Sequence, residues 1–279
     1  MKTRAATRLA WSLWAVNVFL VAVNVLFIVL NRGTSEGDLG GGVPMAAWLA
    51  NIVLAFATVG ALVGSRRAPN QLGWILLAMG LAMALTFAAY GYALYSIFTH
   101  PGSLPGALVM AWFTNWFFVP GIGLFLLFFL LFPTGRLPSQ RWRPVVWSLA
   151  AILSAGTLVA ALMPGTLDDF PTISNPFGLT SAAELLGALD RVLFPILGGF
   201  ALAAGASVVF RYRRAGVEER LQLKWFILAS TVFVTNLLVN EVLTAFGINV
   251  SRITDIVGPL SMAGVPFAMG IAILKYRLY

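Results

Sequence analysis

The fold is decided by residues 107–163, which read ALVMAWFTNWFFVPGIGLFLLFFLLFPTGRLPSQRWRPVVWSLAAILSAGTLVAALM. Two apolar runs, 107–132 and 144–163, flank a short polar segment that carries Arg136, Arg141 and Arg143. Each run is close to the roughly 20 apolar residues that a helix needs to cross the hydrocarbon of a bilayer. We therefore predict two transmembrane helices joined by a tight basic turn.

The same alternation of apolar runs and basic connections extends in both directions along the chain. We predict eight transmembrane helices, at 9–30, 45–65, 72–95, 107–132, 144–163, 188–210, 222–245 and 256–274. The 18 Lys and Arg residues gather at the two chain ends and at alternate connections: Lys2, Arg4, Arg8, Arg66, Arg67, Arg136, Arg141, Arg143, Arg211, Arg213, Arg214, Arg220, Lys224, Lys275 and Arg277, with only Arg32, Arg191 and Arg252 elsewhere. Because basic residues favour the cytoplasmic side, we expect a single all-α polytopic membrane domain with both termini in the cytoplasm.

The composition agrees with a membrane protein and excludes several functional classes. The chain is 59% hydrophobic and 10% charged, whereas soluble domains carry about 25% charged residues. The net charge of +8 indicates anionic lipid headgroups rather than nucleic acid as partner, since the basic residues lie at predicted membrane edges. Cysteine is absent and His100 is the only histidine, so we expect no metal, no cofactor and no catalytic constellation.

A second group of polar residues is predicted on the opposite side of the bilayer. On the run 222–245, Asn236 and Asn240 share a helical face and Glu241 is adjacent. Counting about 1.5 Å per residue from Lys224 puts Glu241 roughly 25 Å up, in the outer part of the bilayer. Four further charged residues lie at the outer ends of neighbouring helices: Asp190, Arg191, Arg252 and Asp255.

These outer residues have two interpretations. They can line one outward-facing ligand pocket in which Glu241 pairs with Arg191 or Arg252, because a carboxylate inside hydrocarbon is usually paired or functional. Alternatively, Asp190, Arg191, Arg252 and Asp255 are solvated residues at the headgroup level. Residues 164–187 are expected to form the longest outer loop.

Two short patterns indicate close packing between helices. Asn17 and Asn24 are seven residues apart, and hence on one helical face, where amides hydrogen-bond to neighbouring helices. Gly60 and Gly64 form a G-x-x-x-G, a spacing that permits close helix approach. We expect that approach within the bundle rather than in a homodimer, although dimerisation stays open.

Three basic connections carry more distinctive motifs than the helices do. They read LFPTGRLPSQRWRP (131–144), FRYRRAGVEERLQLKWF (210–226) and AILKYRLY (272–279). In this order they resemble the multi-pass membrane input region of bacterial two-component sensor histidine kinases, especially the actinobacterial type. The segment RRAPNQLGW (66–74) resembles the N-P-x-G-W of that family, with Gln71 where proline is usual.

The resemblance implies a sensor-like module of the bacterial inner membrane without kinase activity of its own, since this sequence contains neither a phosphoacceptor-histidine domain nor an ATP-binding domain. It would be a truncated kinase, or a receptor that couples in trans to a cytoplasmic kinase or response regulator. The residues implied for anchoring and output are Arg136, Arg141, Trp142, Arg143, Arg220, Lys224, Trp225, Lys275, Tyr276 and Arg277.

Two rival functions remain at this point. A small-solute transporter or channel would place polar groups around broken helices at the membrane midplane, whereas most polar residues here are predicted nearer the outer side. An intramembrane enzyme would need a nucleophile paired with a base, and the predicted spans contain no such pair.

Overall fold

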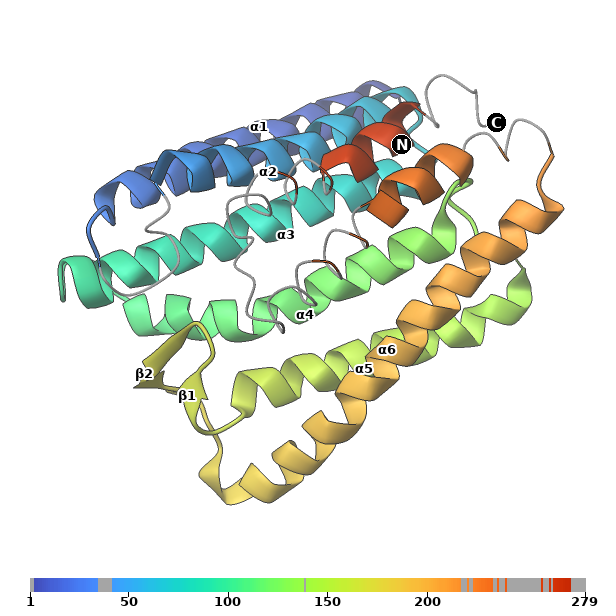
Figure 1. Cartoon of the computed structure of the whole chain (residues 1–279). Coiled ribbons are helices and arrows are strands. Elements are labelled where there is room, and N and C mark those ends of the chain that lie inside the picture. Colours follow the sequence, from blue (N-terminus) through green and yellow to red (C-terminus); the bar gives the residue numbers. More distant parts are fainter. Residues whose placement is uncertain are drawn as a thin grey trace.

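The fold is a bundle of long helices with one small β-hairpin at one end (Figure 1). The computed structural model describes residues 3–34, 42–137, 139–216, 223–232 and 263–271, together with residues 220, 235, 239, 257 and 261. The six principal helices are α1 (Thr3–Leu30), α2 (Gly42–Arg66), α3 (Gln71–Leu94), α4 (Ala107–Leu131), α5 (Arg143–Leu162) and α6 (Ala183–Arg214). A π-helical turn, Tyr95–Thr99, continues α3.

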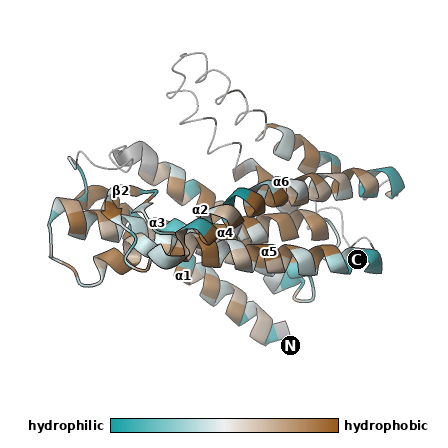
Figure 2. Ribbon diagram, turned by 90° about the horizontal axis from the view of Figure 1, so that it is seen from below, coloured by the Kyte–Doolittle hydropathy of each residue, from teal (hydrophilic) through white to brown (hydrophobic). Residues whose placement is uncertain are grey.

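These six helices are long and apolar enough to cross a membrane. Several large apolar side chains on their outer faces are strongly exposed: Phe19, Trp147, Leu158, Leu185 and Leu202. Exposed apolar surface of this extent on helices of this length is typical of helices that lie in lipid. Figure 2 shows hydrophobic residues along most of the helix lengths and hydrophilic residues at the free end of α6.

Side-chain contacts show that successive helices run antiparallel. Near the start of α1, the hydroxyl of Thr7 donates to the carbonyl of Ser65 at the end of α2 (3.3 Å). Just beyond the other end of α1, Asn31 donates to the carbonyl of Gly91 near the end of α3 (3.0 Å). Contacts of Arg211 with Arg136 and of Gly135 with Asn70 add the other connections, so those that contain Arg66, Arg136 and Arg214 lie at one end of the bundle, here called the basic end.

The predicted helix boundaries at 45–65, 72–95, 107–132 and 144–163 are confirmed within a few residues. Helix α1 begins at Thr3 rather than residue 9, and α6 runs from Ala183 to Arg214 rather than over 188–210. The added turns 3–8 and 211–214 are polar or charged, and 183–187 contains Glu184, so hydropathy does not assign them to a span. Of the predicted helices at 222–245 and 256–274, the structure describes a helix at Leu223–Val232 and helical residues 263–271.

The segment 164–187, predicted as the longest outer loop, is shorter and more structured than expected. Strands β1 (Thr166–Leu167) and β2 (Phe170–Ser174) form an antiparallel hairpin, and α6 already begins at Ala183. The hairpin is held because Phe170 is buried and stacks on Tyr90, with ring centroids 5.1 Å apart, and on Phe98 at 6.1 Å. The buried ring of Phe170 therefore packs the hairpin against the helices.

Helices α1, α2 and α3 pack closely through small residues, as the G-x-x-x-G predicted. A Cβ on Gly60 would lie 2.7 Å from the backbone nitrogen of Leu77, and a Cβ on Gly73 would lie 2.6 Å from that of Gly64. Because side chains larger than hydrogen have no room, the backbones of α2 and α3 touch directly. The motif thus serves packing within the bundle.

Two asparagines of α1 and one just beyond its end lie on the side that meets α3. Asn17, Asn24 and Asn31 are buried at seven-residue intervals. The amide of Asn24 donates to the carbonyl of Ala84 at 3.1 Å, which confirms the predicted interhelical bond. The amide of Asn17 instead donates to Leu13 of its own helix at 2.9 Å.

This difference makes Asn17 a matched control for Asn24. We expect Asn24→Ala to lower the free energy of unfolding by about 0.6 kcal/mol more than Asn17→Ala, the usual contribution of an interhelical hydrogen bond in a membrane protein. Reversible unfolding of both variants in mixed detergent micelles measures the difference. Equal losses would show that the bond to Ala84 adds nothing beyond the volume of the side chain.

Candidate functional site

Several connections meet at the basic end to form one structure, here called the basic junction. It consists of the α2–α3 turn (66–71), the α4–α5 connection (131–143), the end of α6 (210–216) and the helix Leu223–Val232. Three of the four sequence motifs singled out above therefore lie side by side, although they are far apart along the chain.

Arg211 holds the junction together from the last turn of α6. Its side chain is 7% exposed, and its guanidinium donates to four backbone carbonyls at and beyond the end of α4. One terminal nitrogen, Nη1, donates to Leu131 at 3.2 Å and to Phe132. The other, Nη2, donates to Leu130 at 2.5 Å and to Arg136 at 2.8 Å.

The chemistry of a helix end explains why an arginine occupies this position. The last carbonyls of an α-helix have no partner within the helix and carry a partial negative charge. A guanidinium offers five N–H donors in a rigid planar fork and stays protonated. Arg211 can therefore satisfy several of these carbonyls at once and join α6 to the end of α4.

Sequence inspection grouped Arg211 with its neighbours and missed this role. The signal was its spacing, since residues three or four apart share a helical face. Ala204, Ser207, Val208, Arg211 and Ala215 are all buried, so this face points inward. Arg213 and Arg214 lie off that face and are exposed, and the Arg214 guanidinium rests over the Phe210 ring at 4.2 Å.

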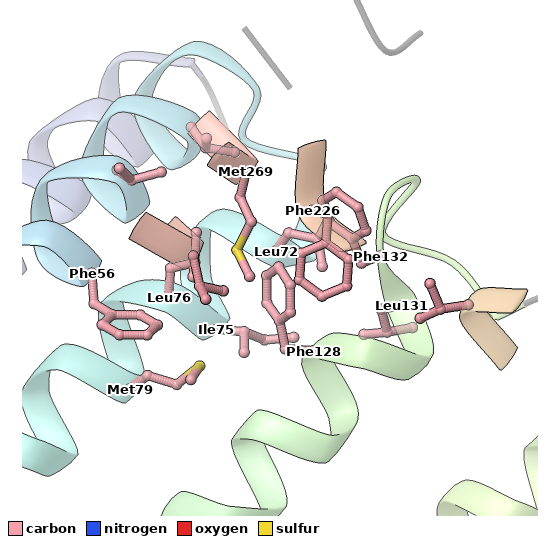
Figure 3. Close-up of a cluster of buried hydrophobic side chains, with 14 of the residues drawn as sticks. Phe56, Leu72, Ile75, Leu76, Met79, Phe128, Leu131, Phe132, Phe226 and Met269 are labelled. Atoms are coloured by element: carbon pink, nitrogen blue, oxygen red, sulfur yellow. The ribbon is translucent and has the colours of Figure 1, made fainter. Parts of the chain in front are cut away.

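An aromatic cluster surrounds Phe132, whose carbonyl accepts from Arg211, and Figure 3 shows Phe128, Phe132 and Phe226 together in it. The ring of Phe226 packs against Phe132 with centroids 4.3 Å apart, against Phe129 at 4.9 Å and against Phe128 at 6.2 Å. Leu72 and Met269 belong to the same buried cluster. The helix Leu223–Val232 is thus fixed to the end of α4 by its apolar side.

The α4–α5 connection also contacts the α2–α3 turn. Gly135 has a positive φ of +74°, and a Cβ there would lie 2.7 Å from the side-chain oxygen of Asn70. That oxygen in turn caps α3 by accepting from the backbone N–H of Leu72 at 3.0 Å. Glycine is needed at position 135 because of both its positive φ and the lack of space for a Cβ. Asn70 contacts the α4–α5 connection and caps α3, so it joins the connection to the start of α3.

The residues predicted as anchors surround this junction. Arg136, Arg141, Arg143, Arg220, Lys224 and Trp225 are exposed, and Trp142 is half-buried. None of these five basic residues forms an ion pair with any described residue, and the four described acidic residues, Asp168, Asp169, Glu184 and Asp190, lie toward the hairpin end. In the described part of the chain, these five basic residues and the acidic residues therefore lie at opposite ends of the bundle. Lys275, Tyr276 and Arg277 lie outside the described residues.

The predicted outer pocket is described only in part. Asp190 and Arg191 lie on the second and third turns of α6, near the hairpin, and the side chain of each is exposed, with no hydrogen bond or ion pair to a described side chain. Asn236, Asn240, Glu241, Arg252 and Asp255 lie outside the described residues. Over the described part of the chain, no three acidic or histidine side chains lie close enough to hold a metal ion.

The hairpin itself carries the perturbed carboxyl group of Asp169. Much of this residue is exposed, but its carboxyl lies against Thr114 of α4. Desolvation there raises the pKa of Asp169 above its ordinary 3.8, a hydrogen bond with Thr114 opposes the rise, and the charge of Asp168 adds to it. The exposure of the residue keeps the associated stabilisation modest.

A raised pKa means that the folded state binds the Asp169 proton more tightly than the unfolded state. This contribution to stability is therefore present below pH 3.8 and is lost as the pH rises through the folded pKa. We expect Asp169→Asn to raise the unfolding temperature relative to the wild type, and to raise it more at pH 7 than at pH 4. Thermal unfolding across this pH range checks the trend.

Thr114→Val provides the opposite change at the same contact. It removes a hydroxyl that donates to the Ala111 carbonyl at 2.9 Å and that also lowers the pKa of Asp169. The part of its stability loss that belongs to Asp169 is therefore the part that grows as the pH rises. A pH-independent difference in unfolding temperature for both variants would contradict the assignment.

Comparison with protein-family models, curated proteins and solved structures gives no match to this chain. The functional proposal therefore rests on the residues and their geometry.

Proposed function

We propose that this chain is a signal-input module of the bacterial inner membrane, resembling the transmembrane region of a sensor histidine kinase. It spans the bilayer with eight helices, and its basic end and both termini face the cytoplasm. It carries no catalysis itself, and it passes a conformational change to a cytoplasmic kinase or response-regulator system.

The observation that carries this proposal is the convergence of the motifs on the basic junction. Three of the four segments that resemble the sensor family are segments that Arg211, Phe226 and Gly135 bring together. Basic residues that only fix the membrane topology would need to be exposed and charged, and would not need buried contacts between connections. A buried, specifically bonded junction at the cytoplasmic face is suited to relaying a change of helix position.

The path between the two membrane sides supports the same proposal. Helix α6 is 32 residues long, so at about 1.5 Å per residue it extends roughly 48 Å. The same helix thus joins the region of Asp190 and Arg191 to Arg211, with Pro195 inside it. An outer ligand that shifts α6 would move the carbonyls bonded to Arg211, and with them the turn after α4.

A chimera tests this function. The full chain is fused after Tyr279 to the cytoplasmic domains of a sensor kinase that drives a transcriptional reporter. Arg211→Lys keeps the charge but loses the fork, so we expect it to change reporter output at unchanged membrane levels. The control Arg213→Lys, at an exposed arginine of the same turn, should leave output unchanged.

The opposite outcome identifies the main rival. Equal reporter output for the wild type, Arg211→Lys and Arg213→Lys would contradict signal relay through the junction. If the purified wild-type chain then also carries a solute across sealed vesicles, the transporter or channel replaces the sensor as the function.

A further inference from the structure

A groove with a polar end and an apolar end runs between α4 and α5. Its polar part has a volume of about 660 Å³ and is lined by Gln71, Arg136, Ser139, Gln140 and Arg143, among others. Its apolar part, about 290 Å³, extends along the two helices past Gly123 and Leu153. Leu127 and Val146 line both parts, so the two hollows adjoin.

The polar end carries positive charge without a described counter-charge. Arg136 and Arg143 are exposed, and neither pairs with any of the acidic residues that the structure describes. Ser139 and Gln140 add hydrogen-bond donors beside them. Guanidinium groups with neutral donors between them suit a phosphate, which accepts several charge-assisted hydrogen bonds.

The apolar end has the length and the chemistry of a lipid-chain site. Along α5, the groove extends from Arg143 to Thr157, a distance of roughly 21 Å at about 1.5 Å per residue. Half of the hydrocarbon core measures about 15 Å, so the groove can hold one acyl chain of a single leaflet. Its lining is almost entirely apolar apart from Ser154 and Thr157.

The geometry points to a binding site for one anionic phospholipid of the cytoplasmic leaflet, with its phosphate between Arg136 and Arg143 and one acyl chain along α4 and α5. Charge complementarity selects an anionic over a zwitterionic headgroup, and the adjoining apolar part selects a lipid over free phosphate. The site also lies against the basic junction, because the carbonyl of Arg136 accepts from Arg211. A bound lipid would therefore contact the same α4–α5 turn that Arg211 binds. This inference rests on the proposed membrane orientation and not on signalling.

Native mass spectrometry of the full chain in detergent tests the site, with phosphatidylglycerol and phosphatidylcholine as probes. We expect phosphatidylglycerol to bind preferentially. In the double variant Arg136→Gln/Arg143→Gln its affinity should fall about 25-fold, because each basic residue near an anionic headgroup contributes about fivefold. The matched control Arg4→Gln/Arg8→Gln removes two exposed charges of the basic end away from the groove and should bind as the wild type does.

The apolar part is tested separately with Ala150→Phe, which fills the groove from an exposed position on α5. We expect phosphatidylglycerol affinity to fall roughly tenfold, because about two methylenes lose their contact. Binding of soluble glycerol phosphate, which has no chain, should stay unchanged in this variant. Unchanged unfolding temperatures establish that each variant is folded.

Two results would overturn the site. Equal phosphatidylglycerol binding by the wild type and the Arg136→Gln/Arg143→Gln variant would remove the headgroup contact. Glycerol phosphate binding as tight as that of the lipid, with no effect of Ala150→Phe, would leave a small-anion site without a lipid chain. Neither result depends on the reporter chimera, so failure of the lipid site is distinguishable from failure of the signalling proposal.

Discussion

Replacing Arg211 with methionine is expected to lower the free energy of unfolding by about 3 kcal/mol, since buried hydrogen bonds from a charged donor are lost and their acceptors stay behind. Methionine approximates the length of the apolar stem, so the change removes the guanidinium more than the packing. The carbonyls of Leu130 and Phe132 then lose their guanidinium donor, while the Leu131 carbonyl keeps the N–H of Gly135. Unfolding of the purified chain in detergent, followed by tryptophan fluorescence, gives the loss.

Arg213→Met is the matched control, because Arg213 is an exposed arginine in the same turn of α6. Its effect should stay within about 0.5 kcal/mol, as for other surface substitutions. Arg211→Lys should fall between the two, since an ammonium keeps the charge but reaches fewer carbonyls. If Arg211→Met and Arg213→Met unfold at the same denaturant concentration, Arg211 does not hold the junction.

The second large effect is expected at Gly60. A methyl group there would lie 2.7 Å from the backbone nitrogen of Leu77 and 2.9 Å from the carbonyl oxygen of Gly73. Backbone atoms of a neighbouring helix cannot move aside as a side chain can, so α2 and α3 must separate. We expect Gly60→Ala to cost about 2–3 kcal/mol, in the range of overpacked cores.

Gly64 provides an internal comparison within the same motif. A Cβ at position 64 meets its nearest atom, the Cβ of Ala10, at 3.6 Å, which is ordinary contact. Gly64→Ala should therefore be neutral or stabilising by up to about 1 kcal/mol, because alanine favours helix over glycine. Unfolding of the two variants in detergent measures the difference. Equal losses in the free energy of unfolding would mean that the close backbone contact at Gly60 has no effect of its own.

Much of this fold follows from periodicity and charge alone. The apolar runs locate α2 to α5 within a few residues, because a span must be both apolar and about 20 residues long. The seven-residue spacing of Asn17 and Asn24 places both on the buried face of α1. The G-x-x-x-G spacing of Gly60 and Gly64 predicts a close approach between two helices. Each of these features is local, so a single sequence contains it.

The remaining features depend on contacts between distant segments. Hydropathy treats Arg211, Arg213 and Arg214 alike, although only the first faces inward and finds the carbonyls at the end of α4. The hairpin depends on Phe170 meeting Tyr90, a partner 80 positions away in the sequence. The groove between α4 and α5 forms only when the two helices pack together, so no local sequence motif predicts it.

The central claim is that the chain spans a membrane with its basic end in the cytoplasm. The sequence contains no cysteine, so single-cysteine variants can be labelled without background. We expect cysteines at Ser139 and Arg214 to resist a membrane-impermeant thiol reagent added to intact cells, and a cysteine at Thr180, beside the hairpin, to react. Labelling of the Ser139 and Arg214 positions from outside, with Thr180 protected, would contradict the orientation on which the proposed function rests.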